Sequence, residues 1–179
     1  LKPVSFCRNL TLETTFLLPG GSILRNYENG NFTDGTFQYA IHPSDAAKPQ
    51  PLTGENIVSL ARQYHFSPYL WGGKSALGID CSGLVQIVFS LCGVLLPRNA
   101  FQQAENGEKI NSLTQAEAGD LAFFANSDHH IVHVGILMNS QQIIHASGWV
   151  KIENIDENGI ISEQTGNYSH TLHSIKRII

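Results

Sequence analysis

The chain has 179 residues, a length that suits one medium-sized domain with a small appendage. Hydrophobic residues make up 42% of it and charged residues 15%, which permits a real core and argues against a disordered chain. The net charge of −4 and the scattered basic residues give no reason to expect nucleic acid or an anionic membrane surface as a partner. No apolar run approaches the ~20 residues of a membrane-spanning helix.

Residues 1–47 are predicted to form a β-rich N-terminal segment. Residues 14–18 and 36–41 have the composition of strands, and Asn29-Gly30 is typical of a hairpin turn. About 45 residues are few for an independent core, so we expect this segment to depend on the main domain or on a module upstream. The Pro-rich stretch 42–51 is predicted to be a linker.

Residues 52–179 are predicted to form the main domain, of the α+β class. A helix is expected to begin after Thr53, a good N-cap, and to end before Pro68. A second helix is expected to begin at Cys81, and a polar stretch at 100–105 has helical character. Strand-like segments then occupy residues 121–124, 133–138, 142–147, 150–155 and 174–179. Helices followed by strands are typical of an α+β domain with an antiparallel sheet.

Cys81 is the first candidate for a chemical role, because it opens a helix. A glycine-punctuated loop precedes it, and the apolar residues after it recur with helical spacing. The unpaired N–H groups and the dipole of a helix N-terminus favour an anion, so we expect the thiolate form to be stabilised. Most cysteines on an apolar helical face are inert core residues, and Cys92 is interpreted so. For Cys81 alone, core packing and catalysis are both open.

The three cysteines form neither a disulfide framework nor a Cys-x-x-Cys metal pair. They suit a reducing compartment, or a reactive thiol protected by its site. The cluster His129-His130-Ile131-Val132-His133 resembles a set of metal ligands, but no partner pattern such as His-Glu-x-x-His accompanies it. No metal site is therefore predicted.

His133 and His145 lie in consecutive predicted strands. If these strands form a hairpin, a two-residue loop would place the two histidines on opposite faces of the sheet. A loop of three or five residues would place both on one face, as a base and its orienting partner require. His145 taken alone could equally be a core histidine with one hydrogen bond.

Six motifs follow one another along the chain. They are Pro68-Tyr69-Leu70-Trp71-Gly72-Gly73, Asp80-Cys81-Ser82-Gly83-Leu84-Val85-Gln86, Leu96-Pro97-Arg98, Gly119-Asp120-Leu121, His133-Val134-Gly135-Ile136 and Ile144-His145-Ala146-Ser147. With these motifs the chain resembles the NlpC/p60 cysteine peptidases, papain-like bacterial enzymes that cut peptidoglycan stem peptides. The resemblance covers about residues 52–179 and implies a nucleophile helix packed on an antiparallel β-sheet.

The resemblance implies a Cys-His-His triad. Cys81 would be the nucleophile, His133 the general base and acid, and His145 the polar residue that orients His133. The residues implied near the oxyanion and the substrate are Tyr69, Trp71, Asp80, Ser82 and Asn99. The bond usually cut in this family joins γ-D-glutamyl to a diamino acid, typically meso-diaminopimelate, and no metal or organic cofactor is required.

Asn99 departs from the family pattern. Members that demand a free N-terminal amine commonly carry an aspartate after the Leu-Pro-Arg motif, and this chain has Asn99 there. Asn99 can accept a hydrogen bond but brings no charge, and Asp80 is a candidate to compensate in part. We therefore expect an enzyme that is less strict about the free amine, or slower on such substrates.

Two other functions are weighed against this one: an amidase or acyltransferase of the same papain-like superfamily, and a non-catalytic module that binds the cell wall. The expected partners are stem peptides or muropeptides, with no nucleic acid, and the protein is expected to be a monomer. Residues 1–47 could be a connector from, or remnant of, an SH3-like module. Free cysteines and small substrates favour the cytoplasm, with the cell envelope after signal cleavage as the alternative.

Overall fold

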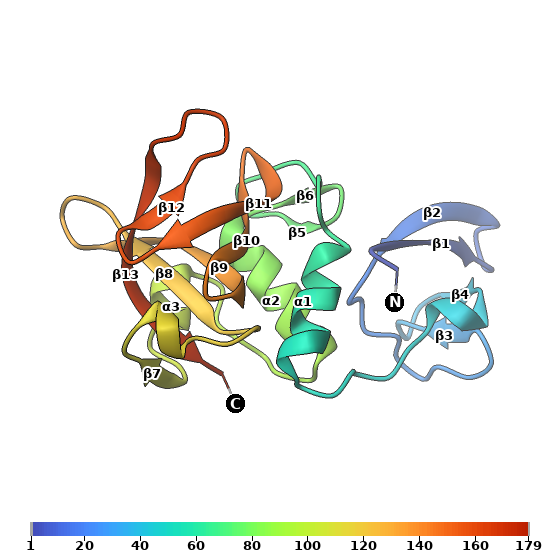
Figure 1. Ribbon diagram of the computed structural model, residues 1–179. Coiled ribbons are helices and arrows are strands. Elements are labelled where there is room, and N and C mark those ends of the chain that lie inside the picture. Colours follow the sequence, from blue (N-terminus) through green and yellow to red (C-terminus); the bar gives the residue numbers. More distant parts are fainter. Residues whose placement is uncertain (1, 179) are drawn as a thin grey trace.

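The structure, a computed structural model, describes residues 2–178, and these form a small N-terminal sheet beside a larger α+β unit (Figure 1). Residues 1 and 179 lie outside this description, and with them the outer ends of the predicted segment 1–47 and of the predicted strand 174–179. The small sheet has the antiparallel order β2-β1-β4-β3. Its strands are β1 (Val4–Asn9), β2 (Thr14–Pro19), β3 (Asn31–Thr33) and β4 (Gln38–Ile41).

The N-terminal sheet has a core of only a few side chains and packs against the larger unit. Its buried apolar residues are Cys7, Phe32 and Ile41. A Cβ atom added to Gly21 would lie 2.5 Å from Cδ1 of Ile87, so the turn after β2 lies directly on the second helix of the larger unit. After the turn η1 (Pro43–Asp45), the chain runs along the bottom of Figure 1 into the first helix.

Three helices belong to the larger unit as the structure describes it. Helix α1 (Gly54–Arg62) begins where the sequence predicts, with the Thr53 hydroxyl accepting a hydrogen bond from the Asn56 N–H at 3.3 Å. Helix α2 (Cys81–Leu91) follows the short hairpin of β5 (Lys74–Ser75) and β6 (Gly78–Ile79). Helix α3 (Ala100–Gln103) is short.

The strands of the larger unit form an antiparallel sheet of order β12-β11-β10-β9-β8-β13-β7. An additional pairing of β12 with β13 closes six of these strands into a barrel, and β7 lies outside it along β13. The strands are β7 (Glu108–Ile110), β8 (Leu121–Ala125), β9 (Ile131–Asn139), β10 (Gln142–Ser147), β11 (Trp149–Asp156), β12 (Gly159–Ile161) and β13 (Tyr168–Arg177). The 3₁₀ turn η2 (Leu113–Gln115) connects β7 to β8.

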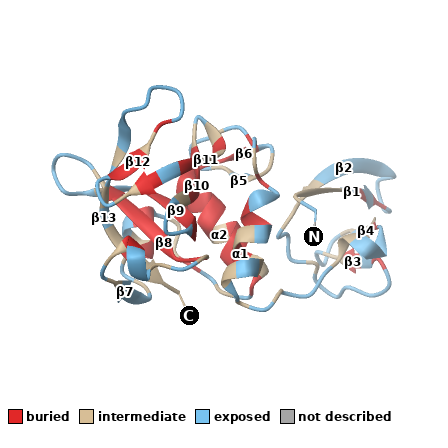
Figure 2. Ribbon diagram, viewed as in Figure 1, coloured by how far each residue is buried: buried red, intermediate tan, exposed pale blue. Residues whose placement is uncertain are grey.

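Side chains alternate between the two faces of the barrel strands and build two cores. The inner core contains Ala122, Phe124, Leu137, Ile143, Ile155, Ile160 and Ile175. The outer face carries Val134, Ile136, Ile144 and Ala146, which pack against α1 and α2. Helix α2 is therefore buried on almost all sides, as the red ribbon between α1 and the strands shows in Figure 2.

The predicted α+β class, with the helix that begins at Cys81 packed on an antiparallel sheet, is confirmed. The closure into a barrel was not predicted, because it depends on β12, a strand of only Gly159–Ile161. None of the helices within residues 2–178 has both the length and the apolarity that a membrane crossing needs.

Candidate active site

Cys81 is the first residue of α2, and Asp80 is the N-cap. The Asp80 side chain accepts a hydrogen bond of 2.7 Å from the Gly83 N–H, which satisfies one of the unpaired donors of the first helical turn. A Cβ atom on Gly83 would lie 2.3 Å from the Gly73 carbonyl oxygen. The glycine-rich loop can therefore pass directly over the start of the helix, and it leaves Cys81 only 8% exposed.

Arg98 holds this helix start in place. Its guanidinium donates to both oxygens of the Asp80 carboxylate and, at 2.8 Å, to the Ser82 hydroxyl. The Gly72 N–H donates to the same carboxylate at 2.8 Å. Burial by itself would raise the pKa of Asp80, but the hydrogen bonds from Arg98 and from the Gly83 and Gly72 N–H groups outweigh it and lower that pKa. Asp80 is thus an ionised N-cap whose oxygens are both occupied.

The Cys81 thiol lies beside the backbone of β9. Burial raises the pKa of this thiol above its usual value, and a hydrogen bond from the backbone of Val134, the residue after His133, partly opposes the rise. The Asp80 carboxylate raises the pKa further. The helix N-terminus therefore does not produce the stabilised thiolate that the sequence predicted, because burial outweighs it. The resting group is a protonated thiol, which needs a base.

His133 on β9 and His145 on β10 are joined by a hydrogen bond of 2.9 Å between Nε2 of His133 and Nδ1 of His145. The β9–β10 connection has two residues, which alone would place the two rings on opposite faces. A β-bulge intervenes: Gln142 pairs with Asn139, but Ile143 pairs with Leu137. This shift of one residue brings both rings to the inner face of the barrel.

The hydrogen-bonded chain continues to β11. Nε2 of His145 lies 2.9 Å from Oε2 of Glu153, whose side chain is 2% exposed. Burial lowers the pKa of His133 well below its usual value, and the nearby His145, His170 and Lys151 side chains further disfavour a positive charge on this ring. Burial also lowers the pKa of His145, although the hydrogen bond to Glu153 opposes this. Both rings are therefore neutral at neutral pH, and His133 can accept a proton.

His170 on β13 is stacked on His133, with ring centroids 4.1 Å apart and planes 25° from parallel. Burial lowers the pKa of His170 to about 4. The ring nitrogens of His133, His145 and His170 lie within 4.8 Å of one another, a distance that would admit a metal ion. Two of these nitrogens, Nε2 of His133 and Nδ1 of His145, are engaged with each other, and Nδ1 of His170 lies 2.9 Å from the Ser169 hydroxyl.

The profile of the NlpC/P60 family matches residues 66–169, which include Cys81, both hydrogen-bonded histidines and Glu153. The chain belongs to the NlpC/P60 family. The match leaves out the N-terminal sheet and runs from before β5 to the start of β13.

Two curated relatives of the chain carry the names of peptidases. The γ-D-glutamyl-L-lysine dipeptidyl-peptidase of Bacillus subtilis is 36% identical over 125 residues, which are 66% of this chain and 42% of that protein. A probable endopeptidase, the NlpC homolog of Haemophilus influenzae, is 33% identical over 75% of this chain and 70% of its own length. The chain spans less than half the length of the three Bacillus subtilis relatives that it matches.

Among solved structures, an NlpC/P60 family protein from Bacillus cereus matches 98% of this chain and 61% of its own length. Its TM-score is 0.77 and its sequence identity 20%. At this identity the likeness concerns the fold, and it extends to the N-terminal sheet as well as to the NlpC/P60 unit.

The remaining residues that the sequence singled out lie at different depths around Cys81. Tyr69 is half-buried, and its pKa is raised by burial and by the neighbouring Cys81 and Asp80. Ser82 is buried beneath Arg98. Trp71 is 84% exposed. Asn99 is also exposed and lies at the start of α3, where its side-chain amide donates a hydrogen bond of 3.1 Å to Gln102.

Sequence reasoning missed Arg98 as the partner of Asp80, and Glu153 and His170 as neighbours of the histidine pair. Arg98 was quoted as part of a motif, but without a role. The sequence did contain a sign of Glu153. It lies two residues before Ile155 in a predicted strand, so both side chains point to the same, buried face, and a buried carboxylate needs a partner. The expected compensation of Asn99 by Asp80 is not supported, since Arg98 already occupies that carboxylate.

Proposed function

We propose that this NlpC/P60 protein is a cysteine peptidase that hydrolyses the bond between γ-D-glutamyl and a diamino acid, such as meso-diaminopimelate, in peptidoglycan stem peptides. In this proposal Cys81 is the nucleophile, His133 the general base and acid, and His145 the residue that orients His133. The names of two relatives, a γ-D-glutamyl-L-lysine dipeptidyl-peptidase and a probable endopeptidase, support the choice of reaction.

One observation carries the proposal: the thiol at the start of α2 contacts the backbone N–H that directly follows His133, and His133 is hydrogen-bonded to His145. A buried cysteine with no chemical role would need neither a helix start nor a histidine at the residue next to its backbone contact on β9. A nucleophile needs both, since the base must take its proton before or during attack.

The first half of the reaction forms a thioester. His133 takes the proton from the Cys81 sulfur, and the sulfur attacks the carbonyl carbon of the γ-D-glutamyl amide. When the tetrahedral intermediate collapses, the C–N bond breaks and His133 gives the proton to the departing amine. The acyl group is then bound to Cys81 through sulfur.

The second half of the reaction releases the acyl group from Cys81. Water enters, His133 takes one of its protons, and the hydroxide attacks the thioester carbon. The C–S bond breaks, the carboxyl group of the glutamyl product forms, and the thiol of Cys81 regains its proton. In each half of the reaction, His133 takes up one proton and gives it back, so the reaction needs no cofactor.

Two donors suit the oxyanion of these intermediates. One is the backbone N–H of Cys81, which belongs to the unpaired donors at the start of α2. The other is the hydroxyl of Tyr69, whose raised pKa keeps it protonated at neutral pH. Each such donor is worth about 2.7–4 kcal/mol in enzymes where it has been removed.

Mass spectrometry of L-Ala-γ-D-Glu-meso-diaminopimelate incubated with the protein tests the proposed bond. The matched control is the isomer in which diaminopimelate is joined through the α-carboxyl group. We expect L-Ala-γ-D-Glu and free diaminopimelate from the γ-linked peptide only, and a lysine peptide extends the test to the second diamino acid. Release of L-Ala, equal cleavage of the α-linked isomer, or an intact γ-linked peptide would contradict the proposal.

A further inference from the structure

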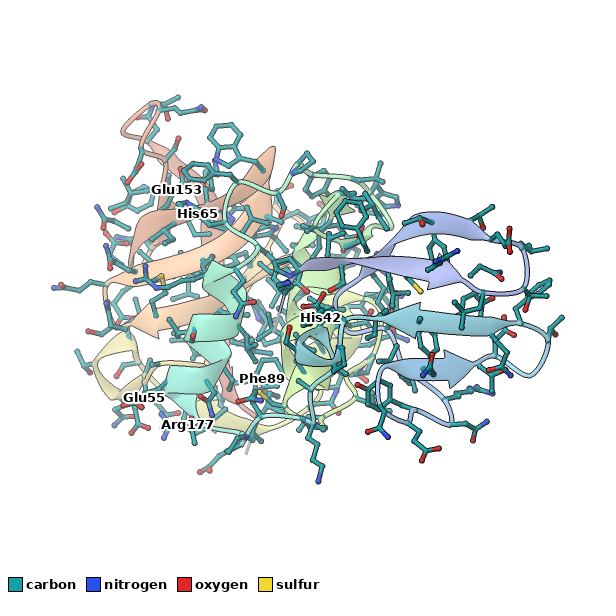
Figure 3. The ribbon with its side chains drawn as sticks, turned by 90° about the vertical axis from the view of Figure 1, so that its right-hand side faces the viewer. His42, Glu55, His65, Phe89, Glu153 and Arg177 are labelled. Carbon is teal, nitrogen blue, oxygen red and sulfur yellow. The ribbon has the colours of Figure 1, made fainter. Side chains whose placement is uncertain are left out.

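Glu153 is a buried carboxylate within none of the motifs by which the sequence was assigned. It lies on β11 among the orange strands of the barrel, away from the N-terminal sheet (Figure 3). Its Oε2 atom faces Nε2 of His145 at 2.9 Å. Its Oε1 atom accepts a hydrogen bond of 3.1 Å from the Glu163 N–H and lies 3.3 Å from the Lys151 ammonium. Each oxygen of the carboxylate therefore has at least one polar partner.

Glu153 is ionised throughout the physiological range. Burial would raise the pKa of its carboxyl group, but the hydrogen bond from His145, that from the Glu163 backbone and the charge of Lys151 outweigh it and lower the pKa to about 2. An ionised carboxylate can only accept hydrogen bonds. The atom that faces it on His145 must therefore carry a hydrogen.

This requirement fixes the protonation of two rings. His145 is neutral, so a hydrogen on its Nε2 leaves Nδ1 bare. The bare Nδ1 is the acceptor that faces Nε2 of His133, which must then carry the hydrogen of that bond. His133 is also neutral, so its Nδ1 is the ring atom with a free lone pair.

We propose that Glu153 is a positioning residue that, through His145, fixes the tautomer of His133 and makes its Nδ1 atom the base for Cys81. The inference rests on the proposed function, since it assigns His133 the part of the base. It adds a fourth member to the triad, joined diagonally across three neighbouring strands, β9, β10 and β11.

Glu153 also balances the charge that appears during the reaction. When His133 takes the thiol proton, the resulting imidazolium donates through Nε2 to His145, which in turn donates to the carboxylate. Besides Cys81, the other charged or titratable groups against the pair among residues 2–178 are Lys151 on β11 and His170 on β13. Lys151 is a cation, so Glu153 is the one negative charge among these neighbours.

Substitution of Glu153 by glutamine is the sharpest test, because the surroundings dictate how the amide must lie. The Glu163 N–H and the Lys151 ammonium both require an acceptor, so the amide oxygen faces them. The NH₂ group then faces Nε2 of His145, which must become an acceptor. The hydrogen moves to Nδ1 of His145, and His133 must carry its own hydrogen on Nδ1, where it can no longer accept one.

We expect Glu153→Gln to lower kcat by up to about 10⁴-fold with KM little changed, the size seen when a catalytic histidine is held in the wrong tautomer. Glu153→Asp keeps the charge and should recover a part of the loss. Glu108→Gln removes the same charge from an exposed position on β7, outside the barrel, and should leave kcat unchanged.

Long-range ¹H–¹⁵N correlation spectra of the histidine rings read the tautomers directly, without substrate. At neutral pH we expect the hydrogen of His133 on Nε2 in the wild-type protein and in Glu153→Asp, and on Nδ1 in Glu153→Gln. A wild-type His133 with its hydrogen on Nδ1 would overturn the proposal, even if Glu153→Gln does not fold. So would a folded Glu153→Gln protein with unchanged tautomers and kcat. If the wild-type protein cuts no stem peptide, the proposed function fails while the tautomer result still stands.

Discussion

Arg98 and Asp80 form a two-pronged ion pair directly before Cys81. Both terminal nitrogens of the guanidinium donate to the carboxylate, and one of them also reaches Ser82. The Asp80 side chain is 7% exposed and that of Arg98 33%, so the pair lies at the edge of the core. The start of α2 is thus fixed by a residue seven positions beyond its end.

Removal of Arg98 should therefore destabilise the protein. Arg98→Met would strand a buried carboxylate, and we expect a loss of about 3 kcal/mol in the free energy of unfolding. Arg98→Lys should recover less than half of it, since one ammonium cannot make both contacts. Urea unfolding followed by circular dichroism measures the loss. An Arg98→Met protein as stable as the wild type would show that the pair contributes nothing.

Gly135 should tolerate no side chain. A Cβ atom there would lie 2.6 Å from Cδ1 of Ile143 and 3.0 Å from Cβ of His145. Gly135→Ala should therefore push β10 away, at a cost of about 1–3 kcal/mol, and lower kcat because His145 moves off His133. Urea unfolding and steady-state kinetics on the same preparation separate the two effects. An unchanged kcat would mean that the histidine pair does not depend on this close approach.

Acid should destabilise the protein in two stages. The folded-state pKa values of His133, His145 and His170 lie below the ordinary value of 6.5, so the unfolded chain binds more protons and stability falls as the pH drops below about 6.5. The contribution of His170 is lost by about pH 4. Glu153, with a pKa of about 2 against an ordinary 4.5, contributes a further loss between these values.

The urea midpoint measured across this pH range checks the sign. His170→Phe keeps an aromatic ring on His133 but removes one titrating group, so the midpoint of this variant should fall less steeply between about pH 6.5 and pH 4. A midpoint that stays level or rises as the pH falls through this range would contradict the buried, neutral state of the histidines.

Asn99 offers a test of substrate preference. It is exposed, and its backbone and side-chain N–H groups both donate to Gln102, so aspartate can replace it without disturbing the core. Asn99→Asp should raise the ratio of kcat/KM for free over N-acetylated stem tripeptide by about two- to fivefold, the range of an exposed ion pair. Asn99→Ala is the control. Equal ratios in the two variants would exclude this position as the partner of the ammonium group.

The sequence predicted the parts of the site that local pattern determines. Cys81 at a helix start and the two strand histidines follow from spacing and from motifs. The placement of His133 and His145 on one face could not be decided, because a bulge between Gln142 and Ile143 shifts the register by one residue. A bulge of this kind has no short-range signal in the sequence.

Other features depend on tertiary contacts. The partner of Asp80 could not be derived, since Arg98 lies beyond the end of α2 and reaches back to its start. The state of Cys81 was predicted wrongly because a helix N-terminus was considered without the burial that opposes it. Glu153 was missed because its role exists only where β10 and β11 pair.

The central claim is that Cys81 performs the hydrolysis with His133 as its base. The most direct measurement is cleavage of L-Ala-γ-D-Glu-meso-diaminopimelate by the wild-type protein, by Cys81→Ala and by Cys92→Ala, each checked for folding by circular dichroism. Cys92 ends the same helix and is equally buried, so it is the matched control. We predict cleavage by the wild type and by Cys92→Ala, and none by Cys81→Ala. Cleavage by folded Cys81→Ala at the wild-type rate would contradict the account.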